Sequence, residues 1–166
     1  MKQIKIRKMT LKEEYTQMVM EYKDVIFKVC YIYAEKEYID DYYQEVLIQL
    51  WRSFPKFRGD SKLSSWIYRI SLNTCISFVR KKKRNLPLAP IDVEVTIYDE
   101  SFEKRQQLEV LYNLINKLNK LEKSIILLWL EERSYEEIAS ITGLSRNNVA
   151  IKLNRIKEKL KNMSNE

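Results

Sequence analysis

Apolar residues recur at helical spacing in two stretches of the N-terminal half of the chain. The stretches are Tyr22, Ile26, Val29 and Tyr33, and then Tyr43, Val46, Leu47 and Leu50. Spacings of three and four residues place apolar side chains on one face of an α-helix. Pro55 and Gly59 interrupt the pattern. A third helix is predicted from about Ser64 to Arg84, so residues 11–84 are expected to be a set of packed helices.

A second set of helices is predicted in the C-terminal part. Its apolar stripe is Leu111, Leu114, Ile115, Leu118 and Leu121. Ser134 and Glu137 have the spacing of a capping box, which marks the start of a short helix. Gly143 then predicts a turn, and Ser145 predicts the N-cap of a last helix from about Arg146 to Lys161. A short helix, a glycine turn and a second helix make a helix-turn-helix.

The stretch between these two parts has a different composition. It holds Pro87 and Pro90, and between residues 92 and 109 six acidic residues stand against two basic ones. Such a stretch is typical of a linker. We therefore predict a basic N-terminal tail at 1–10, a first domain at 11–85, an acidic linker at 86–107 and a second domain at 108–166. With only 2 Gly and 3 Pro in 166 residues, turn-rich β folds are disfavoured. The predicted fold class is all-α, with two small helical domains.

The amino-acid composition limits the reactions, metal sites and partners that this chain can be expected to have. The chain has no His, which removes the commonest general base and the commonest metal ligand. Cys30 and Cys75 lie far apart in the sequence and form no CxxC motif, so we expect neither a metal site nor a cofactor. The two cysteines are expected to be buried thiols in a reducing cytosol, and the alternative is one disulfide between them. The sequence also lacks a P-loop and clustered metal ligands, which argues against an enzyme that acts on nucleic acid. The formal net charge of +7 favours an anionic partner.

The last predicted helix has one apolar and one basic face. Val149, Leu153, Ile156 and Leu160 form the face expected to be buried. Between 145 and 162 six basic residues stand against one acidic residue, which suits a helix that reads bases in the major groove and holds phosphates. Ile151 lies off the buried face, where it is either incidental or contacts a thymine methyl group. The alternative for the whole unit is a helical hairpin with a solvated basic face.

Two features of the N-terminal half also suit partners. The residues at i, i+3, i+4 and i+7 from Asp41 form a polar strip that fits a helical partner, although spacing alone favours a solvated face. The segment from Phe57 to Asn73 mixes aromatic, basic and small polar residues, as proteins that bind single-stranded nucleic acid do. Trp66 by itself is more typical of a core residue than of a stacking platform.

These residues resemble a known family. The run from Asp41 to Trp51, with its D-x-x-Q-E core, is similar to region two of the sigma-70 family of RNA polymerase sigma factors. The segment from Phe57 to Asn73 resembles the part of that region that recognises and melts DNA. Residues 118–160 resemble region four, and the chain has no room for the further domains of larger sigma factors. The resemblance is to the small extracytoplasmic-function (ECF) type, and it covers about 20–85 and 108–162.

The resemblance implies three sets of site residues. Contacts to the clamp helices of the polymerase beta-prime subunit would come from Asp41, Gln44, Glu45 and Ile48. Recognition of the minus-ten element, including capture of a flipped base by the loop 61–64, would come from Ser61, Lys62, Leu63, Ser64, Trp66, Arg69, Asn73 and Arg80. Recognition of the minus-thirty-five element would come from Ser145, Arg146, Asn147, Asn148, Ile151, Lys152 and Arg155. The stretch Ala150–Lys152 departs from the usual family pattern, so the resemblance carries no promoter sequence with it.

The implied function is a sigma factor that binds core RNA polymerase, recognises promoter DNA and promotes strand opening without catalysing a reaction itself. Its implied partners are the polymerase clamp helices and beta flap, promoter DNA and an anti-sigma factor. No signal peptide follows the basic N-terminus and no apolar run is long enough to span a membrane, so we expect a cytoplasmic protein. The alternative is a helix-turn-helix regulator that binds duplex DNA without polymerase, but such a regulator does not need the segment 41–73.

Overall fold

The computed structural model describes residues 8–82 and 102–165, although not the side chains of 79–82 and 102–108. Within this part of the chain every regular element is helical, which confirms the predicted all-α class. The elements are α1 (Leu11–Tyr33), the 3₁₀ turn η1 (Lys36–Tyr38), α2 (Ile39–Ser53), the 3₁₀ turn η2 (Phe54–Lys56), α3 (Leu63–Lys82), α4 (Phe102–Asn116), α5 (Lys120–Leu130), α6 (Tyr135–Thr142) and α7 (Arg146–Ser164).

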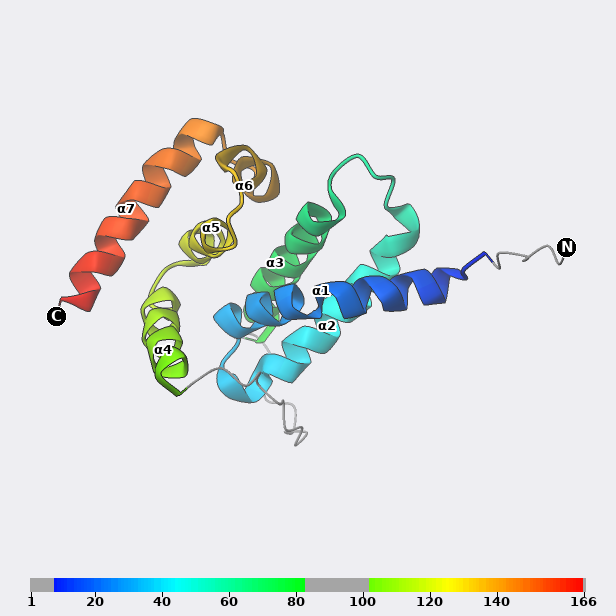
Figure 1. Ribbon diagram of the computed structural model, residues 1–166, viewed down its shortest axis with the longest axis horizontal. Helices are drawn as coiled ribbons and strands as arrows, with labels where there is room; N and C mark the ends of the chain where they lie inside the picture. The colour runs from blue at the N-terminus through cyan, green and yellow to red at the C-terminus, as the bar shows by residue number, and fades with distance from the viewer. Residues whose placement is uncertain (1–7, 83–101, 166) are drawn as a thin grey trace, which may run out of the picture.

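Helices α1, α2 and α3 pack against one another in a bundle (Figure 1). Their apolar stripes meet in a common core, in which Ile26, Val46, Leu50 and Ile67 are fully buried. Burial of each such side chain stabilises the bundle by about 1.5–3 kcal/mol relative to exposure. The three predicted N-terminal helices are therefore present, and the break at Pro55 and Gly59 is observed as η2 and the loop that follows it.

The sulfur atoms of Cys30 and Cys75 lie 4.0 Å apart in this core, one on α1 and one on α3. Both are buried free thiols, as the sequence predicts. The thiol of Cys75 hydrogen-bonds to Cys30 and is buried, and both effects raise its pKa well above the ordinary value. The Cys75 thiol is therefore held in its protonated form.

Helices α4 to α7 form the second group, and α6 and α7 are its helix-turn-helix (Figure 1). The Ser134 side chain accepts a hydrogen bond from the Glu137 backbone N–H, and the reciprocal bond completes the predicted capping box. Gly143 ends α6 with φ of 77°, a left-handed conformation that favours glycine. The Ser145 side chain then caps α7. The turn chemistry expected from the sequence is thus observed at each of its three positions.

Helix α4 begins at Phe102, inside the stretch predicted as linker. Residues 102–107 contain neither Pro nor Gly and are mostly good helix formers, so they extend the helix that the apolar stripe predicts from 108 onwards. The rest of that stretch, the tail residues 1–7 and the predicted helix end at residues 83 and 84 lie outside the described residues. In the described ranges no helix is long and apolar enough to cross a membrane.

The two groups of helices pack against each other. Helix α1 contacts α4 and α5, and α3 contacts α6. Tyr31 of α1 meets Tyr112 of α4 edge-on, with ring centroids 5.0 Å apart. The buried residues of both groups form one continuous hydrophobic cluster. The chain thus brings the loop before α3 close to the start of the helix-turn-helix.

Candidate functional site

Helix α7 presents a polar and basic face to solvent. Its inner side is fixed by Val149, Leu153 and Ile156, which are fully buried against the rest of the helix-turn-helix. The seven residues predicted to read duplex DNA all lie on the outer side, and all of them are exposed except Lys152, which is half-buried. Ile151 is 51% exposed, a large value for an isoleucine. The geometry therefore suits a helix lying in a DNA groove.

Some cations of α7 are already engaged by neighbouring groups. The Arg146 guanidinium lies 2.6 Å from Glu136 and over the ring of Tyr135. A backbone hydrogen bond and the bond from Arg146 both lower the pKa of Glu136. The Lys157 ammonium lies 3.9 Å from the ring centroid of Trp129, on the side of the helix towards α5. Lys157 is thus placed to pack against the domain, whereas Arg155 is exposed and Lys152 is half-buried.

Helix α2 carries the polar strip predicted for a protein partner. Gln44 and Ile48 are exposed, and Asp41 and Glu45 are half-buried. The Glu45 carboxylate accepts a hydrogen bond of 2.8 Å from the Gln49 amide. The strip is therefore continuous along one side of the helix, with an exposed aliphatic side chain among polar ones.

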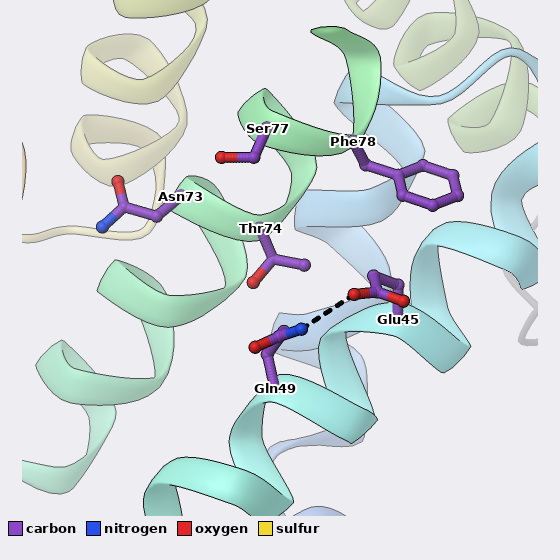
Figure 2. A pocket seen from close by; sticks show the side chains of 6 residues that line it. All are labelled: Glu45, Gln49, Asn73, Thr74, Ser77 and Phe78. Carbon is purple, nitrogen blue, oxygen red and sulfur yellow. Dashed lines mark hydrogen bonds between the residues drawn. The ribbon is translucent and has the colours of Figure 1, made fainter. Parts of the chain in front are cut away.

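Helices α2 and α3 border a groove of about 390 Å³ (Figure 2). Its lining is Glu45, Gln49, Asn73, Thr74, Ser77 and Phe78. In Figure 2 Thr74 lies across from Glu45 and Gln49, whereas Asn73 points away from them on the α3 side. The groove therefore separates the strip on α2 from the exposed polar side of α3.

The loop before α3 and the first turns of that helix hold most of the residues predicted to bind single-stranded DNA. Gly59 has φ of 77° and allows the chain to turn there. Lys62 and Asn73 are exposed, whereas the remaining described members of the set are half-buried. Trp66 packs on Phe57, with ring centroids 5.0 Å apart, and only part of its ring faces solvent. The side chain of Arg80 lies outside the described residues.

Two family models match this chain. The model of sigma-70 region 2 matches residues 18–85, and the model of sigma-70 region 4 matches residues 108–160. Together they cover most of the sequence. The chain belongs to the sigma-70 family.

Curated relatives place it in the ECF type of that family. The chain is 27% identical to the ECF RNA polymerase sigma-E factor of Haemophilus influenzae, over 91% of this chain and 87% of the relative. It is also 27% identical to the protein of the same name from Escherichia coli strain K12, over 87% of this chain and 83% of the relative. The chain functions in promoter recognition and transcription initiation by RNA polymerase.

Solved structures share the fold. One is the sigma factor RpoE in complex with the anti-sigma factor NepR from Bartonella quintana, with a TM-score of 0.71 and 19% identity over 92% of this chain and 97% of that one. Another is CnrH in complex with the cytosolic domain of CnrY, with a TM-score of 0.67 and 20% identity over 93% of this chain and 89% of that one. The two helical domains of the sigma factor correspond to regions 2 and 4.

The structure adds residues that sequence reasoning missed. Trp51 is 41% exposed and extends the α2 strip by one further turn beyond Ile48. Trp51 lies three residues after Ile48, and this helical spacing could have predicted that it belongs to the same face. Arg133 and Glu131, between α5 and α6, contact region 2 through Ser64, Tyr68 and Lys28. No local sequence pattern marks these two residues. Among the described residues no cluster of three metal-ligating side chains is found.

Proposed function

We propose that this sigma factor binds core RNA polymerase through the α2 strip of Asp41, Gln44, Glu45 and Ile48. Polar side chains around an exposed isoleucine suit a helical partner, because apolar contact supplies attraction and the polar groups fix the register. The partner implied by the family resemblance is the pair of clamp helices of the beta-prime subunit. Trp51 extends the same surface, and large aromatic side chains are frequent anchors of interfaces.

The loop before α3 is the proposed site for the nontemplate strand of the minus-ten element. The loop from Ser61 to Ser64 would capture a flipped base, Arg69 and Arg80 would hold the backbone, and Asn73 would meet the adjoining duplex. Leu63 would line the base pocket, and the exposed edge of Trp66 would border it. Flipping costs a few kcal/mol of lost stacking, which the pocket contacts must offset.

Helix α7 is the proposed reader of the minus-thirty-five element. Its exposed N-terminal residues Ser145, Arg146, Asn147 and Asn148 would reach base edges, and Lys152 and Arg155 would hold phosphates. Ile151 would contact a thymine methyl group. The rest of the region 4 domain would dock on the beta flap of the polymerase.

The remaining proposals concern the domain boundaries, the cellular compartment and an inhibitory partner. We assign residues 11–85 to the region 2 domain and 108–166 to the region 4 domain, with residues 1–10 as a basic tail and 86–107 as an acidic linker that runs near the polymerase active centre. The sigma factor acts in the cytoplasm as a non-enzymatic subunit. An anti-sigma factor is its proposed inhibitor, since the solved relatives RpoE and CnrH are seen with NepR and with the cytosolic domain of CnrY.

The α2 strip carries the proposal, because a regulator that binds duplex DNA alone has no use for it. The test is gel filtration of the chain with core RNA polymerase. We expect wild type to co-elute and Gln44→Ala plus Glu45→Ala to bind at least tenfold more weakly, since hot-spot truncations cost about 2 kcal/mol or more. The matched control is Gln17→Ala plus Glu21→Ala, which removes the same groups from exposed positions on α1. Equal binding by both double variants would contradict the clamp assignment.

A further inference from the structure

Two aromatic rings join the ends of the loop that is proposed to capture a flipped base. Phe57 stands at the start of this loop, directly after η2, and Trp66 lies in the first turn of α3. Their ring centroids are 5.0 Å apart, and the ring planes are tilted by 45°. Residues 61–64, the proposed base-capturing stretch, lie between them in the sequence. We call this ring pair the aromatic clasp.

The backbone of the loop has few fixed points of its own. The Phe57 N–H donates to the Phe54 carbonyl at 3.1 Å, and the Trp66 N–H donates to the Lys62 carbonyl at 3.1 Å. Between these two bonds, residues 58–61 make no backbone hydrogen bond to another backbone group in the described part of the chain. Gly59 adds conformational freedom. Within region 2, the loop is therefore spanned by ring contacts of Trp66.

Trp66 is itself fixed on the bundle. It packs against the buried cluster, and its ring centroid lies 6.4 Å from that of Phe54. Phe54 meets Tyr15 of α1 edge-on at 5.7 Å, and the Tyr15 hydroxyl donates a hydrogen bond of 2.7 Å to the Leu47 carbonyl of α2. The series of rings thus continues from α3 to the other two helices of the bundle. Trp66 therefore offers Phe57 a fixed surface.

Phe57 differs from the other rings of this series in its surroundings. It is half-buried, and it is not among the described apolar residues that pack against the buried core. Its described ring contact is with Trp66, which lies nearer to it than to Phe54. A ring outside the core adds little to the stability of the bundle. The location therefore favours a role in the shape of the loop.

A flipped base is bound best by a pocket that is already formed. Removal of a base from its stack is unfavourable, and any ordering of the loop on binding adds to that cost. A loop that is held in one conformation before binding avoids the second cost. The proposed pocket residues from Ser61 to Ser64 all lie on the segment that the aromatic clasp holds.

We propose that Phe57 is a positioning residue of the minus-ten site, which acts through its ring contact with Trp66 to keep the base-capturing loop in its binding conformation. The inference rests on the proposed assignment of residues 61–64 to base capture. Phe57 itself does not touch the base. Its loss should therefore lower the contribution of the captured base and leave the other contacts of the strand in place.

The test measures how much each base contributes to strand binding. The chain is used in complex with core RNA polymerase, and core polymerase alone gives the background. A fluorescein-labelled strand of about 20 nucleotides is enriched from a random pool by the wild-type complex, and each of its bases is then replaced in turn by an abasic site. Anisotropy gives the affinities. For wild type we expect one position with the largest loss, about tenfold.

The main variant is Phe57→Leu, which should reduce that largest loss to about twofold and leave the losses at other positions as in wild type. Phe57→Tyr keeps the ring and should retain the wild-type loss. Phe27→Leu is the matched control, because it makes the same change at a half-buried ring on α1, beside Tyr31. It should also retain the wild-type loss. Circular dichroism shows whether each variant is folded.

Failure of the positioning role is separable from failure of base capture. If Phe57→Leu keeps the wild-type loss, or if Phe57→Tyr behaves as Phe57→Leu does, the base site stands and the role of the ring is wrong. Equal weakening at every position, or an unfolded Phe57→Leu, would assign the ring to the support of the bundle and would overturn the proposal. If wild type has no position that responds to removal of a base, base capture and the role of Phe57 are both contradicted.

Discussion

The Tyr33 hydroxyl donates a hydrogen bond of 2.6 Å to the backbone oxygen of Lys120. It thereby ties the last turn of α1 in region 2 to the first turn of α5 in region 4. The Ser124 hydroxyl lies 2.5 Å from the same phenol oxygen and bonds to the same carbonyl. Burial raises the pKa of Tyr33 far above its ordinary value, so the phenol remains a donor. A polar group thus fixes the register of the two domains inside an apolar contact.

Tyr33→Phe should weaken the packing of the two domains. The variant keeps the ring in the core and removes one buried hydrogen bond, so we expect the free energy of unfolding to fall by about 1 kcal/mol. Thermal or urea denaturation followed by circular dichroism measures the change. Tyr22→Phe, in the same helix and half-buried, is the control and should have little effect. Equal stability of Tyr33→Phe and wild type would show that the bond does not hold the domains together.

Local features of the fold could be predicted from the sequence. The capping box of Ser134 and Glu137, the left-handed Gly143 and the cap at Ser145 depend on residues within a few positions of one another. The buried face of α7 follows from helical periodicity, as does the outward position of Ile151. These features depend only on the geometry of one helix end or one helix face, so they can be predicted from the spacing of residues in the sequence.

The contacts between domains could not be predicted in the same way. Glu137 was expected only as a capping residue, but it also pairs with Lys62 across the domain boundary. Arg133 stands in a short stretch without periodicity, and its partners lie on α3. Such pairs depend on how two bundles pack, and side-chain spacing within one helix carries no information about that. The three candidate surfaces were therefore predicted separately. The contact between α3 with the loop before it and α6 with the segment before it was not predicted.

Lys152 and Arg155 of α7 should set the salt dependence of duplex binding. Lys152→Ala and Arg155→Ala each remove one proposed phosphate contact, so the slope of log affinity against log salt should fall by about one unit for each. Anisotropy titrations with a labelled duplex at several salt concentrations measure the slope. Lys157→Ala is the control with the same charge change, because its ammonium packs on Trp129. A slope that falls equally for Lys157→Ala would remove the distinction between the two sides of α7.

Ile151 should discriminate thymine from uracil at one position of the bound duplex. Burial of a methyl group stabilises a complex by about 0.8 kcal/mol, so loss of the thymine methyl at that position should weaken binding about fourfold. The measurement replaces each thymine of a selected minus-thirty-five duplex by uracil in turn. Ile151→Ala should be insensitive to the replacement to which wild type responds. If no single position distinguishes the two proteins, the exposed isoleucine does not read a base.

The two cysteines should resist alkylation in the folded protein. Reaction needs an accessible thiolate. The raised pKa of Cys75 keeps its thiolate scarce, and burial shields both sulfur atoms from the reagent. We expect slow labelling of wild type by a thiol reagent in buffer and rapid labelling of both thiols in denaturant. Ser164→Cys, at the exposed end of α7, supplies a reactive thiol for comparison. Rapid native labelling of wild type would mean that α1 and α3 separate readily.

Acid should destabilise region 4 through its capping carboxylates. Partial burial raises the pKa of Glu122, but the backbone N–H of Asn119 and the ammonium of Lys159, 3.0 Å away, lower it more. A carboxyl whose pKa is lowered in the folded state stabilises that state above its unfolded pKa, and the contribution is lost as the pH falls through the folded pKa. The free energy of unfolding should therefore fall between about pH 5 and about pH 3. Glu122→Gln keeps the capping geometry but cannot ionise, so its stability should fall less over this range than that of wild type. Glu158→Gln, an exposed change on α7, should follow wild type, and an equally steep fall for Glu122→Gln would assign the acid sensitivity to other groups.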